Sequence, residues 1–304
     1  MADPLRVGVI GCGFFAQNHL HSWKSLAGEG ASLTAVCDIN PAKAKAAAET
    51  FGAQHWYSDV DRMLAAEKLD LVDIVTRVET HEEMVGRTIA ARIPTIVQKP
   101  FGPDLAASEA MAKAAAAAGV FLAVHENFRF QAPFRRIAAL LRAGAIGQPS
   151  WARISFRTAY DIYRTQPYLL REERFILIDL GVHVLDLARV FLGEVAHLSA
   201  ETQRRDPRVA GEDTATMLLR HRGGGVHPSR GSDNSARAAA PQRAWRASER
   251  NRRPSLDLVV AHCDPTGSAA PERPGRCSRW ASSASAALAS AGARPDKDRP
   301  VAFS

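Results

Sequence analysis

Short apolar runs alternate with amphipathic or alanine-rich stretches over the first 125 residues, and this alternation constrains the fold more than any other feature. The apolar runs predict strands at 5–10, 32–37, 71–75, 94–98 and 120–124. The stretches between them predict helices near 15–26, 41–51, 59–66, 80–91 and 104–118. Apolar runs without polar alternation suit strands that are covered on both faces. The pattern therefore predicts an α/β fold with a doubly wound parallel sheet.

The turn after the first predicted strand has the spacing G-x-G-x-x-A, formed by Gly11, Gly13 and Ala16. Gly11 permits a tight turn, Gly13 lets the backbone approach a pyrophosphate, and Ala16 keeps the helix close to the strand. The free N–H groups at the start of the next helix can bind the phosphate. With a strand before it and a helix after it, the motif predicts a dinucleotide-binding Rossmann domain.

Asp38 follows the second predicted strand and favours NAD over NADP. An acid at this place accepts hydrogen bonds from the ribose hydroxyls and repels a 2′-phosphate. The alternative role for Asp38 is a helix cap, but Asn40 and Pro41 already supply an N-cap and first-turn pair. Cys12 lies inside the glycine turn, where we expect a small packed residue.

The histidines and cysteines do not predict a metal site. His19 and His21 are two apart on a predicted helix and diverge, and neither they nor the pair His81 and Glu82 have a further ligand at suitable spacing. The four cysteines have no CxxC or zinc-finger spacing, so we expect reduced thiols in a cytoplasmic protein. No apolar run is long enough to predict a membrane span, and the N-terminal residues do not resemble a signal peptide.

The net charge of +7 comes entirely from one end of the chain. Residues 221–304 hold 14 basic and 7 acidic residues, and the two kinds balance in residues 1–220. The well-patterned part of the chain therefore lacks the basic surface that nucleic-acid binding needs. We expect a small-molecule substrate, with neither a nucleic acid nor a membrane as a partner.

Two further stretches carry candidate catalytic residues. Lys99 ends the fifth predicted strand, at the sheet edge where ligands bind, and a lysine there can polarise a hydroxyl or a carbonyl. Residues 175–195 have helical periodicity that places Asp179, His183 and Asp186 on one face, and an acid beside a histidine stabilises its protonated form. A surface lysine and a structural histidine are the alternatives that these residues leave open.

Five motifs together resemble the Gfo/Idh/MocA family of oxidoreductases, which includes glucose–fructose oxidoreductase and inositol dehydrogenases. They are GCGFFA (11–16), Asp38, QKP (98–100), HENFR (125–129) and DLGVHVLD (179–186). The resemblance covers roughly residues 5–220. It implies an NAD-binding Rossmann domain over 1–125 and an α+β substrate and oligomerisation domain over 126–222, with an open, mostly antiparallel sheet that is incomplete here. For an intact member we expect a homo-dimer or tetramer.

The resemblance implies hydride transfer between NAD and a sugar, polyol or related hydroxy compound. Lys99, Asp179 and His183 would be the catalytic residues: His183 exchanges the hydroxyl proton, Lys99 stabilises charge on the same oxygen, and Asp179 orients the substrate or tunes the other two. A non-catalytic NAD-binding regulator of the same fold, or an inactive truncated product, is the alternative.

The remaining site residues follow from the same resemblance. The cofactor set comprises Gly11, Gly13, Phe14, Ala16, Asp38, Thr76, Gln98, Lys99 and Asn127. Arg129, Tyr163 and Tyr168 join the catalytic three as expected substrate contacts. Two departures from the family pattern affect this set: Gln98 stands where the family has an acid before the lysine, and residues 76–80 lack its usual Thr-Pro-Asn-type turn.

The pattern ends near residue 222. Residues 195–205 and 212–221 predict two alternating strands, but only eight of the 84 residues from 221 onward are Leu, Ile, Val or Phe. This composition predicts disorder over 223–304. A basic nucleic-acid-binding tail would cluster its charges, and a linker would need a domain after it. We favour a frameshift between about residues 220 and 228, because GC-rich codons read out of frame give this Arg, Ala, Ser, Pro and Gly mixture.

Overall fold

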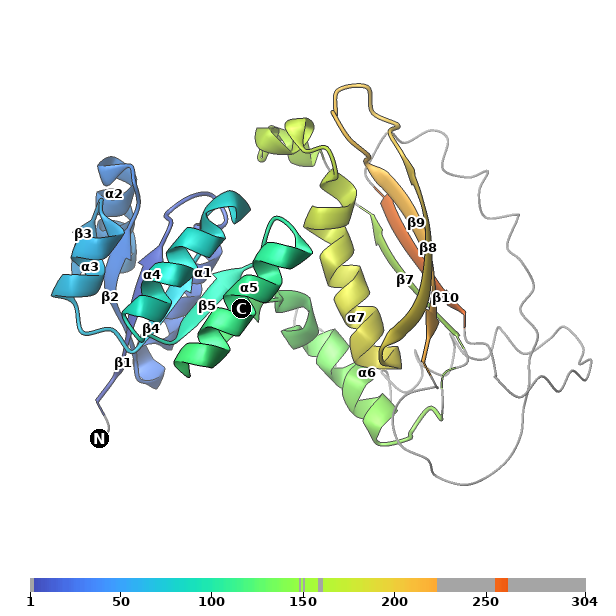
Figure 1. Ribbon diagram of the computed structural model, residues 1–304, viewed down its shortest axis with the longest axis horizontal. Coiled ribbons are helices and arrows are strands. Elements are labelled where there is room, and N and C mark those ends of the chain that lie inside the picture. Colours follow the sequence, from blue (N-terminus) through green and yellow to red (C-terminus); the bar gives the residue numbers. More distant parts are fainter. Residues whose placement is uncertain (1–2, 148, 150, 158–160, 223–254, 262–304) are drawn as a thin grey trace, which may run out of the picture. The chain divides into compact units, whose positions relative to one another are not determined.

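The computed structural model describes residues 3–147, 149, 151–157, 161–222 and 255–261 (Figure 1). The described chain divides into two compact units with a boundary between Asn127 and Phe128. Each unit has a sheet and hydrophobic clusters of its own. Among the helices that the structure describes, none is long and apolar enough to cross a membrane.

The first unit contains a six-stranded sheet of order β3-β2-β1-β4-β5-β6, in which every pairing is parallel. Its strands are β1 Leu5–Ile10, β2 Ala31–Cys37, β3 His55–Tyr57, β4 Leu71–Ile74, β5 Thr95–Gln98 and β6 Leu122–His125. The predicted doubly wound parallel sheet is therefore confirmed. Strand β3 was not predicted, because this three-residue edge strand is mostly exposed and carries no apolar run.

Five α-helices connect these strands and cover both faces of the sheet. They are α1 Ala16–Ser25, α2 Pro41–Phe51, α3 Val60–Ala66, α4 His81–Ala90 and α5 Leu105–Ala118, with short 3-10 turns at Leu26–Glu29 and Val78–Thr80. Leu20 of α1 and Phe51 of α2 pack into one buried cluster. Met63 of α3, Val85 of α4 and Met111 of α5 pack into another, which includes the alternate residues of the strands. This arrangement places the loops after β1, β2 and β5 at one edge of the sheet.

The second unit contains a four-stranded sheet of order β7-β10-β9-β8. The strands are β7 Trp151–Arg157, β8 Val195–Gln203, β9 Thr214–His221 and β10 Ser255–Ala261. The β7–β10 and β8–β9 pairings are antiparallel and the β9–β10 pairing is parallel, so the predicted mostly antiparallel sheet is confirmed. The predicted strands at 195–205 and 212–221 correspond to β8 and β9.

The structure describes six helical elements in or bordering this unit, of which α6, η6 and α7 pack against its sheet. They are η3 Asn127–Phe130, α6 Ala132–Arg142, η4 Ile162–Arg164, η5 Pro167–Arg171, the π-helix η6 Ile176–Gly181 and α7 Val182–Leu192. Leu141 of α6 and Leu187 of α7 share a buried cluster with Met217 and Leu219 of β9. Residues 175–195 were predicted as one helix with α-helical spacing, whereas the structure has a π-helical segment before α7.

Of the predicted disordered or frameshifted region 223–304, the structure describes only β10. This segment has the sequence SLDLVVA and contains four of the eight Leu, Ile, Val or Phe residues found from 221 onward. Strand formation at Ser255–Ala261 differs from the prediction, because that prediction used the average composition of the region and not its local pattern. The other residues of this region lie outside the described part of the chain.

Candidate functional site

The glycine turn after β1 requires glycine at its first position. Gly11 has φ +96°, and its N–H donates to the Cys37 carbonyl at 2.7 Å. A Cβ at Gly11 would lie 2.5 Å from the Val75 carbonyl oxygen. At Gly13, by contrast, an added Cβ would meet no atom within 4 Å. The turn therefore has no room for a side chain at Gly11, which faces the sheet, and is open at Gly13. A pyrophosphate needs this open space to approach the backbone.

The Asp38 carboxylate is held beside this turn by two backbone groups. Its Oδ2 accepts from the Cys12 N–H at 2.8 Å, and its Oδ1 accepts from the Asn40 N–H at 2.8 Å. Each carboxylate oxygen can accept a second hydrogen bond. The turn and the acid therefore fit the pyrophosphate and the ribose hydroxyls of a dinucleotide. Asn40 caps α2 through a 3.0 Å bond from the Ala42 N–H, so Asp38 is not its cap.

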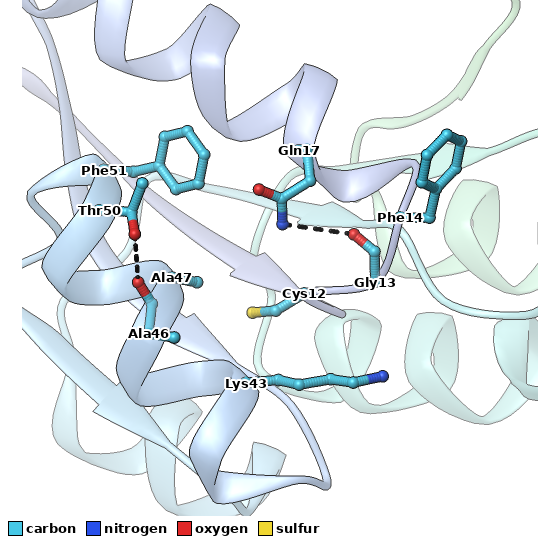
Figure 2. Close-up of a pocket in the computed structure, with 9 residues that line it drawn as sticks. All are labelled: Cys12, Gly13, Phe14, Gln17, Lys43, Ala46, Ala47, Thr50 and Phe51. Carbon is cyan, nitrogen blue, oxygen red and sulfur yellow. Dashed lines mark hydrogen bonds between the residues drawn. The ribbon is translucent and has the colours of Figure 1, made fainter. Parts of the chain in front are cut away.

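A cavity of about 310 Å³ lies beside the turn, with the turn and the start of α1 on one side and α2 on the other (Figure 2). Cys12, Gly13, Phe14 and Gln17 line the first side, and Lys43 lies on the second. Cys12 is buried, and burial together with the Asp38 charge raises the pKa of its thiol to about 12. The thiol therefore stays protonated near neutral pH, as expected of a packed residue.

Gln98 and Lys99 lie at the end of β5, and the Lys99–Pro100 peptide bond is cis. The Gln98 side chain is buried, and its Oε1 accepts from the Lys99 backbone N–H at 2.6 Å. Its Nε2 lies 3.2 Å from His19 Nε2. Thr76, which follows β4, accepts a hydroxyl hydrogen bond from Thr80 at 2.8 Å. These cofactor-site candidates thus lie at the ends of two neighbouring strands, β4 and β5, or directly after them.

Sequence reasoning missed the buried partners of Gln98. His19 Nδ1 and Trp23 Nε1 each lie 2.8 Å from Asp73 Oδ2. His19 was considered only as a metal ligand. An acid inside the apolar run LVDIV was the signal that could have revealed the network, because a carboxylate buried in a central strand needs a donor. His21, the other histidine of that helix, packs its ring against Phe51 at 4.8 Å.

His183 and Asp179 lie in the second unit, on consecutive helical segments. His183 is 4% exposed, and its ring stacks on Phe128 with centroids 4.0 Å apart and planes 6° apart. Asp179 lies in the π-helix η6, one turn before His183 in α7. π-Helical segments occur frequently at functional sites. The arrangement holds the imidazole ring in one orientation with an acid nearby in the sequence.

The expected substrate contacts of the second unit have protein partners in the structure. Arg129 Nε donates to Asp186 Oδ2 at 2.8 Å, and its Nη2 donates to the other oxygen, so η3 is joined to α7. Tyr163 is buried beneath the Arg208 guanidinium, which lies 5.4 Å from its ring centroid. Burial, followed by the nearby Asp213 and Asp206 charges, raises the Tyr163 pKa.

The remaining candidates are an exposed tyrosine, Tyr168, and a half-buried asparagine, Asn127. Tyr168 donates a hydrogen bond to Gln166 Oε1 at 2.9 Å. Asn127 begins η3 at the boundary between the units. The structure thus brings the turn residues and Asp38 together in the first unit, with Gln98 and Lys99 at the same sheet edge. Asp179 and His183 belong to the second unit. Within the described ranges, no three His, Cys, Asp or Glu side chains form a group that could hold a metal.

Two family models match the chain. The model "Oxidoreductase family, NAD-binding Rossmann fold" matches residues 5–126, and the "GFO/IDH/MocA C-terminal domain" model matches residues 134–247. A D-apiose dehydrogenase of Paraburkholderia graminis is 48% identical over 216 residues, which cover 71% of this chain and 57% of the relative. A D-apiose dehydrogenase of Rhizobium rhizogenes is 45% identical over 72% of this chain and 63% of its own. The chain thus spans less than two thirds of either relative.

A solved structure provides a third comparison. An oxidoreductase of Agrobacterium radiobacter, crystallised with NAD+, L-tartaric acid and magnesium, is 37% identical with a TM-score of 0.70. The match covers 87% of this chain and 68% of that protein. The glycine turn with Asp38, the two-unit fold and these matches all indicate the same family. The chain belongs to the Gfo/Idh/MocA family of oxidoreductases.

Proposed function

We propose that the chain binds NAD and serves the oxidation or reduction of a CH–OH group in a sugar, polyol or related hydroxy compound. The observation that carries the proposal is the Asp38 carboxylate, fixed by two backbone N–H groups beside a glycine turn that is open at Gly13. An acid in this place favours ribose hydroxyls over a 2′-phosphate, and hence NAD over NADP. The D-apiose dehydrogenases, 48% and 45% identical, make a sugar the first substrate class to test.

Three residues would perform the protein's part of the chemistry. His183 takes the proton of the substrate hydroxyl during oxidation and returns it during reduction. Its stacking on Phe128 supports this role, because it restricts the ring to one orientation. Lys99 donates a hydrogen bond to the same oxygen and stabilises its developing negative charge, and Asp179 orients the substrate. When bound, NAD supplies the hydride acceptor.

The test measures binding and turnover separately on the full chain. Calorimetry with NAD and NADP should show preferential NAD binding, and Asp38→Ala should remove most of that preference. Absorbance at the nicotinamide band should change with a member of a panel containing D-apiose, myo-inositol, scyllo-inositol and L-tartrate. Lys99→Ala should lower turnover at least about a hundredfold, and calorimetry on the same variant measures how much Lys99 contributes to NAD binding.

One result would favour the alternative function. NAD binding without turnover across the panel would indicate a non-catalytic NAD-binding protein or an inactive product. The expected homo-dimer or tetramer and the expected cytoplasmic location belong to the same proposal. Light scattering on the purified chain tests the first, and fractionation of the producing cells tests the second.

A further inference from the structure

A chain of buried polar groups runs beneath the backbone of Lys99. Asp73 is 2% exposed, His19 5% and Gln98 6%. Asp73 Oδ2 lies 2.8 Å from both Trp23 Nε1 and His19 Nδ1. His19 Nε2 lies 3.2 Å from Gln98 Nε2, and Gln98 Oε1 accepts from the Lys99 N–H at 2.6 Å. These hydrogen bonds join α1, β4 and the end of β5, three elements that adjoin the cofactor edge of the sheet.

The donors and acceptors in this row of hydrogen bonds allow only one direction of donation, from Lys99 toward Asp73. A backbone N–H is always a donor, so the Gln98 oxygen must face Lys99 and the Gln98 amide nitrogen must face His19. The amide nitrogen donates, so His19 Nε2 must carry a lone pair. The ring proton then lies on His19 Nδ1 and is donated to Asp73. Starting from one backbone group, the hydrogen bonds therefore fix the tautomer of a buried histidine.

We propose that Gln98, His19 and Asp73 are positioning residues for Lys99, and that they require His19 as the neutral, Nδ1-protonated tautomer. The part of this proposal that concerns catalysis rests on the proposed function; the tautomer and the hydrogen bond to Lys99 do not. α1 begins three residues after Gly13. The hydrogen bonds therefore also connect the helix of the glycine turn to the lysine that follows β5.

This arrangement requires an amide at position 98. A glutamate there can accept from the Lys99 N–H, but it has no N–H to donate to His19. Its second oxygen would need a proton on His19 Nε2, which turns the ring into an imidazolium between two carboxylates. His125 of β6 is a further ionisable group that faces the ring, with its ring centroid 4.2 Å away. Phe15 contributes an apolar edge at 5.7 Å.

The tautomer is measured by ¹⁵N NMR of the histidine side chains in the full chain, without NAD or substrate, at about pH 7.5. His19→Gln identifies the His19 signals by their disappearance. We expect a protonated Nδ1 and an unprotonated Nε2 in the wild type, and imidazolium character in Gln98→Glu. An Nε2-protonated ring or an imidazolium in the wild type would overturn the proposal.

The effect on Lys99 is measured by hydrogen exchange of its backbone amide. Gln98→Leu removes the acceptor and should raise the exchange rate at least about tenfold. Gln98→Glu keeps an acceptor and should leave the rate nearly unchanged. Equal exchange in the wild type and Gln98→Leu would contradict the positioning role, whether or not the chain turns over any substrate.

The catalytic consequence is a separate readout. If the chain is active, Gln98→Leu, which removes the hydrogen bond to Lys99, should lower kcat about tenfold, and Gln98→Glu, which keeps that bond, should lower it less. Asp73→Asn is the matched control, because its amide oxygen still accepts from His19 Nδ1 and Trp23 Nε1 and so keeps the same tautomer. A loss of the Nδ1-protonated signal in Asp73→Asn would show that the Asp73 charge, and not the direction of the hydrogen bonds from Lys99, sets the tautomer of His19. Failure of all forms to turn over would contradict the proposed function, and the NMR and exchange results would still decide the inference.

Discussion

At the scale of single residues, the two glycines of the turn have different physical tasks. Gly11 combines a positive φ of +96° with a contact that leaves no room for a Cβ, whereas Gly13 faces open space. The motif G-x-G-x-x-A predicted this division of tasks, and the structure adds its cause: the carbonyl of Val75, directly after β4, lies where a Cβ of Gly11 would be. One glycine therefore serves the fold and the other serves the ligand.

This difference predicts opposite results for two alanine variants. Gly11→Ala should lower the free energy of unfolding by about 2 kcal/mol or more, since left-handed backbone strain adds to the contact with the Val75 carbonyl. Gly13→Ala should leave stability nearly unchanged but weaken NAD binding, because its methyl group enters the space of the pyrophosphate. Urea unfolding and NAD calorimetry test both variants; equal destabilisation by the two would contradict the assignment.

A surface ion pair predicts a pH dependence of stability. Arg6 donates to Asp70 from its backbone N–H at 2.9 Å and from its side chain at 2.7 Å, and these bonds lower the Asp70 pKa to about 2. A lowered folded-state pKa contributes stability above the unfolded pKa of about 4, and the contribution is lost as the pH falls toward about 2. Asp70→Asn should therefore destabilise at pH 7 and differ progressively less from the wild type below about pH 4.

The control for that experiment is a change in ionic strength. Arg6 and Asp70 side chains are 43% and 37% exposed, so solvent screens the pair and its contribution should shrink at high ionic strength. A pH-independent effect of Asp70→Asn between pH 7 and 3 would show that the lost group acts through something other than its charge.

At this scale, residues whose function fixes their spacing along the chain could be predicted. Residues that meet only when helices and strands pack together could not. Asp38 could be recognised because it follows a strand at a fixed distance from the glycine turn. The contact between His19 and Asp73 could not, since the two are 54 residues apart and meet only when α1 covers β4. The pairing of Arg129 with Asp186, 57 residues away, was equally outside the reach of local pattern.

At the scale of elements, α2 shows how completely a local signal can specify a helix. Asn40 and Pro41 predicted its start, and the structure begins the helix at Pro41 with the Asn40 side chain accepting from the Ala42 N–H. Asn40→Ala should lower stability by about 1 kcal/mol. NAD affinity should not change, because the bond to Asp38 comes from the Asn40 backbone.

Asn40→Asp, which retains a capping oxygen, is the matched control and should keep most of the stability. Thermal unfolding measures both variants, and calorimetry measures NAD binding. A loss of NAD affinity in Asn40→Ala at unchanged stability would contradict this division between cap and ligand site.

The segment before α7 shows the limit of periodicity. Apolar spacing in residues 175–195 predicted a helix but could not distinguish the π-helix Ile176–Gly181 from an α-helix, because both are compatible with the same short apolar pattern. The difference changes the relation of Asp179 to His183, since one turn of a π-helix contains more residues than one turn of an α-helix. Side-chain placement at this site therefore follows from the structure alone.

The docking of η3 on α7 predicts a measurable coupling. Arg129 and Asp186 form a two-bond ion pair, and the adjacent Phe128 stacks on His183. A double-mutant cycle with Arg129→Ala and Asp186→Ala should give a coupling of about 0.5–1 kcal/mol, kept small because the Arg129 side chain is 41% exposed. A coupling near zero would mean that the ion pair does not help to hold η3 on α7.

At the scale of the whole molecule, the two units follow from two different patterns in the chain. Continuous apolar runs separated by helices gave the parallel sheet, and alternating runs after residue 195 gave the antiparallel pair β8–β9. The pairing of β10 between β7 and β9 could not be predicted, because seven residues with no neighbouring pattern do not specify a register. The order of strands in the second sheet is thus a product of tertiary contacts.

The change in composition near residue 221 carries the last prediction. Bases and acids balance up to residue 220, and the whole excess of +7 comes after it. β8 in the same unit is exposed along almost its full length, with Leu198 and, on β9, Leu218 each about half exposed. An open antiparallel sheet of this kind gains stability from further strands with alternating polarity. Sequencing the coding DNA should therefore reveal, downstream of codon 220, a shifted frame that encodes such strands. A chain produced from that frame should unfold at a higher temperature than this one; the absence of any strand-like frame would contradict the frameshift.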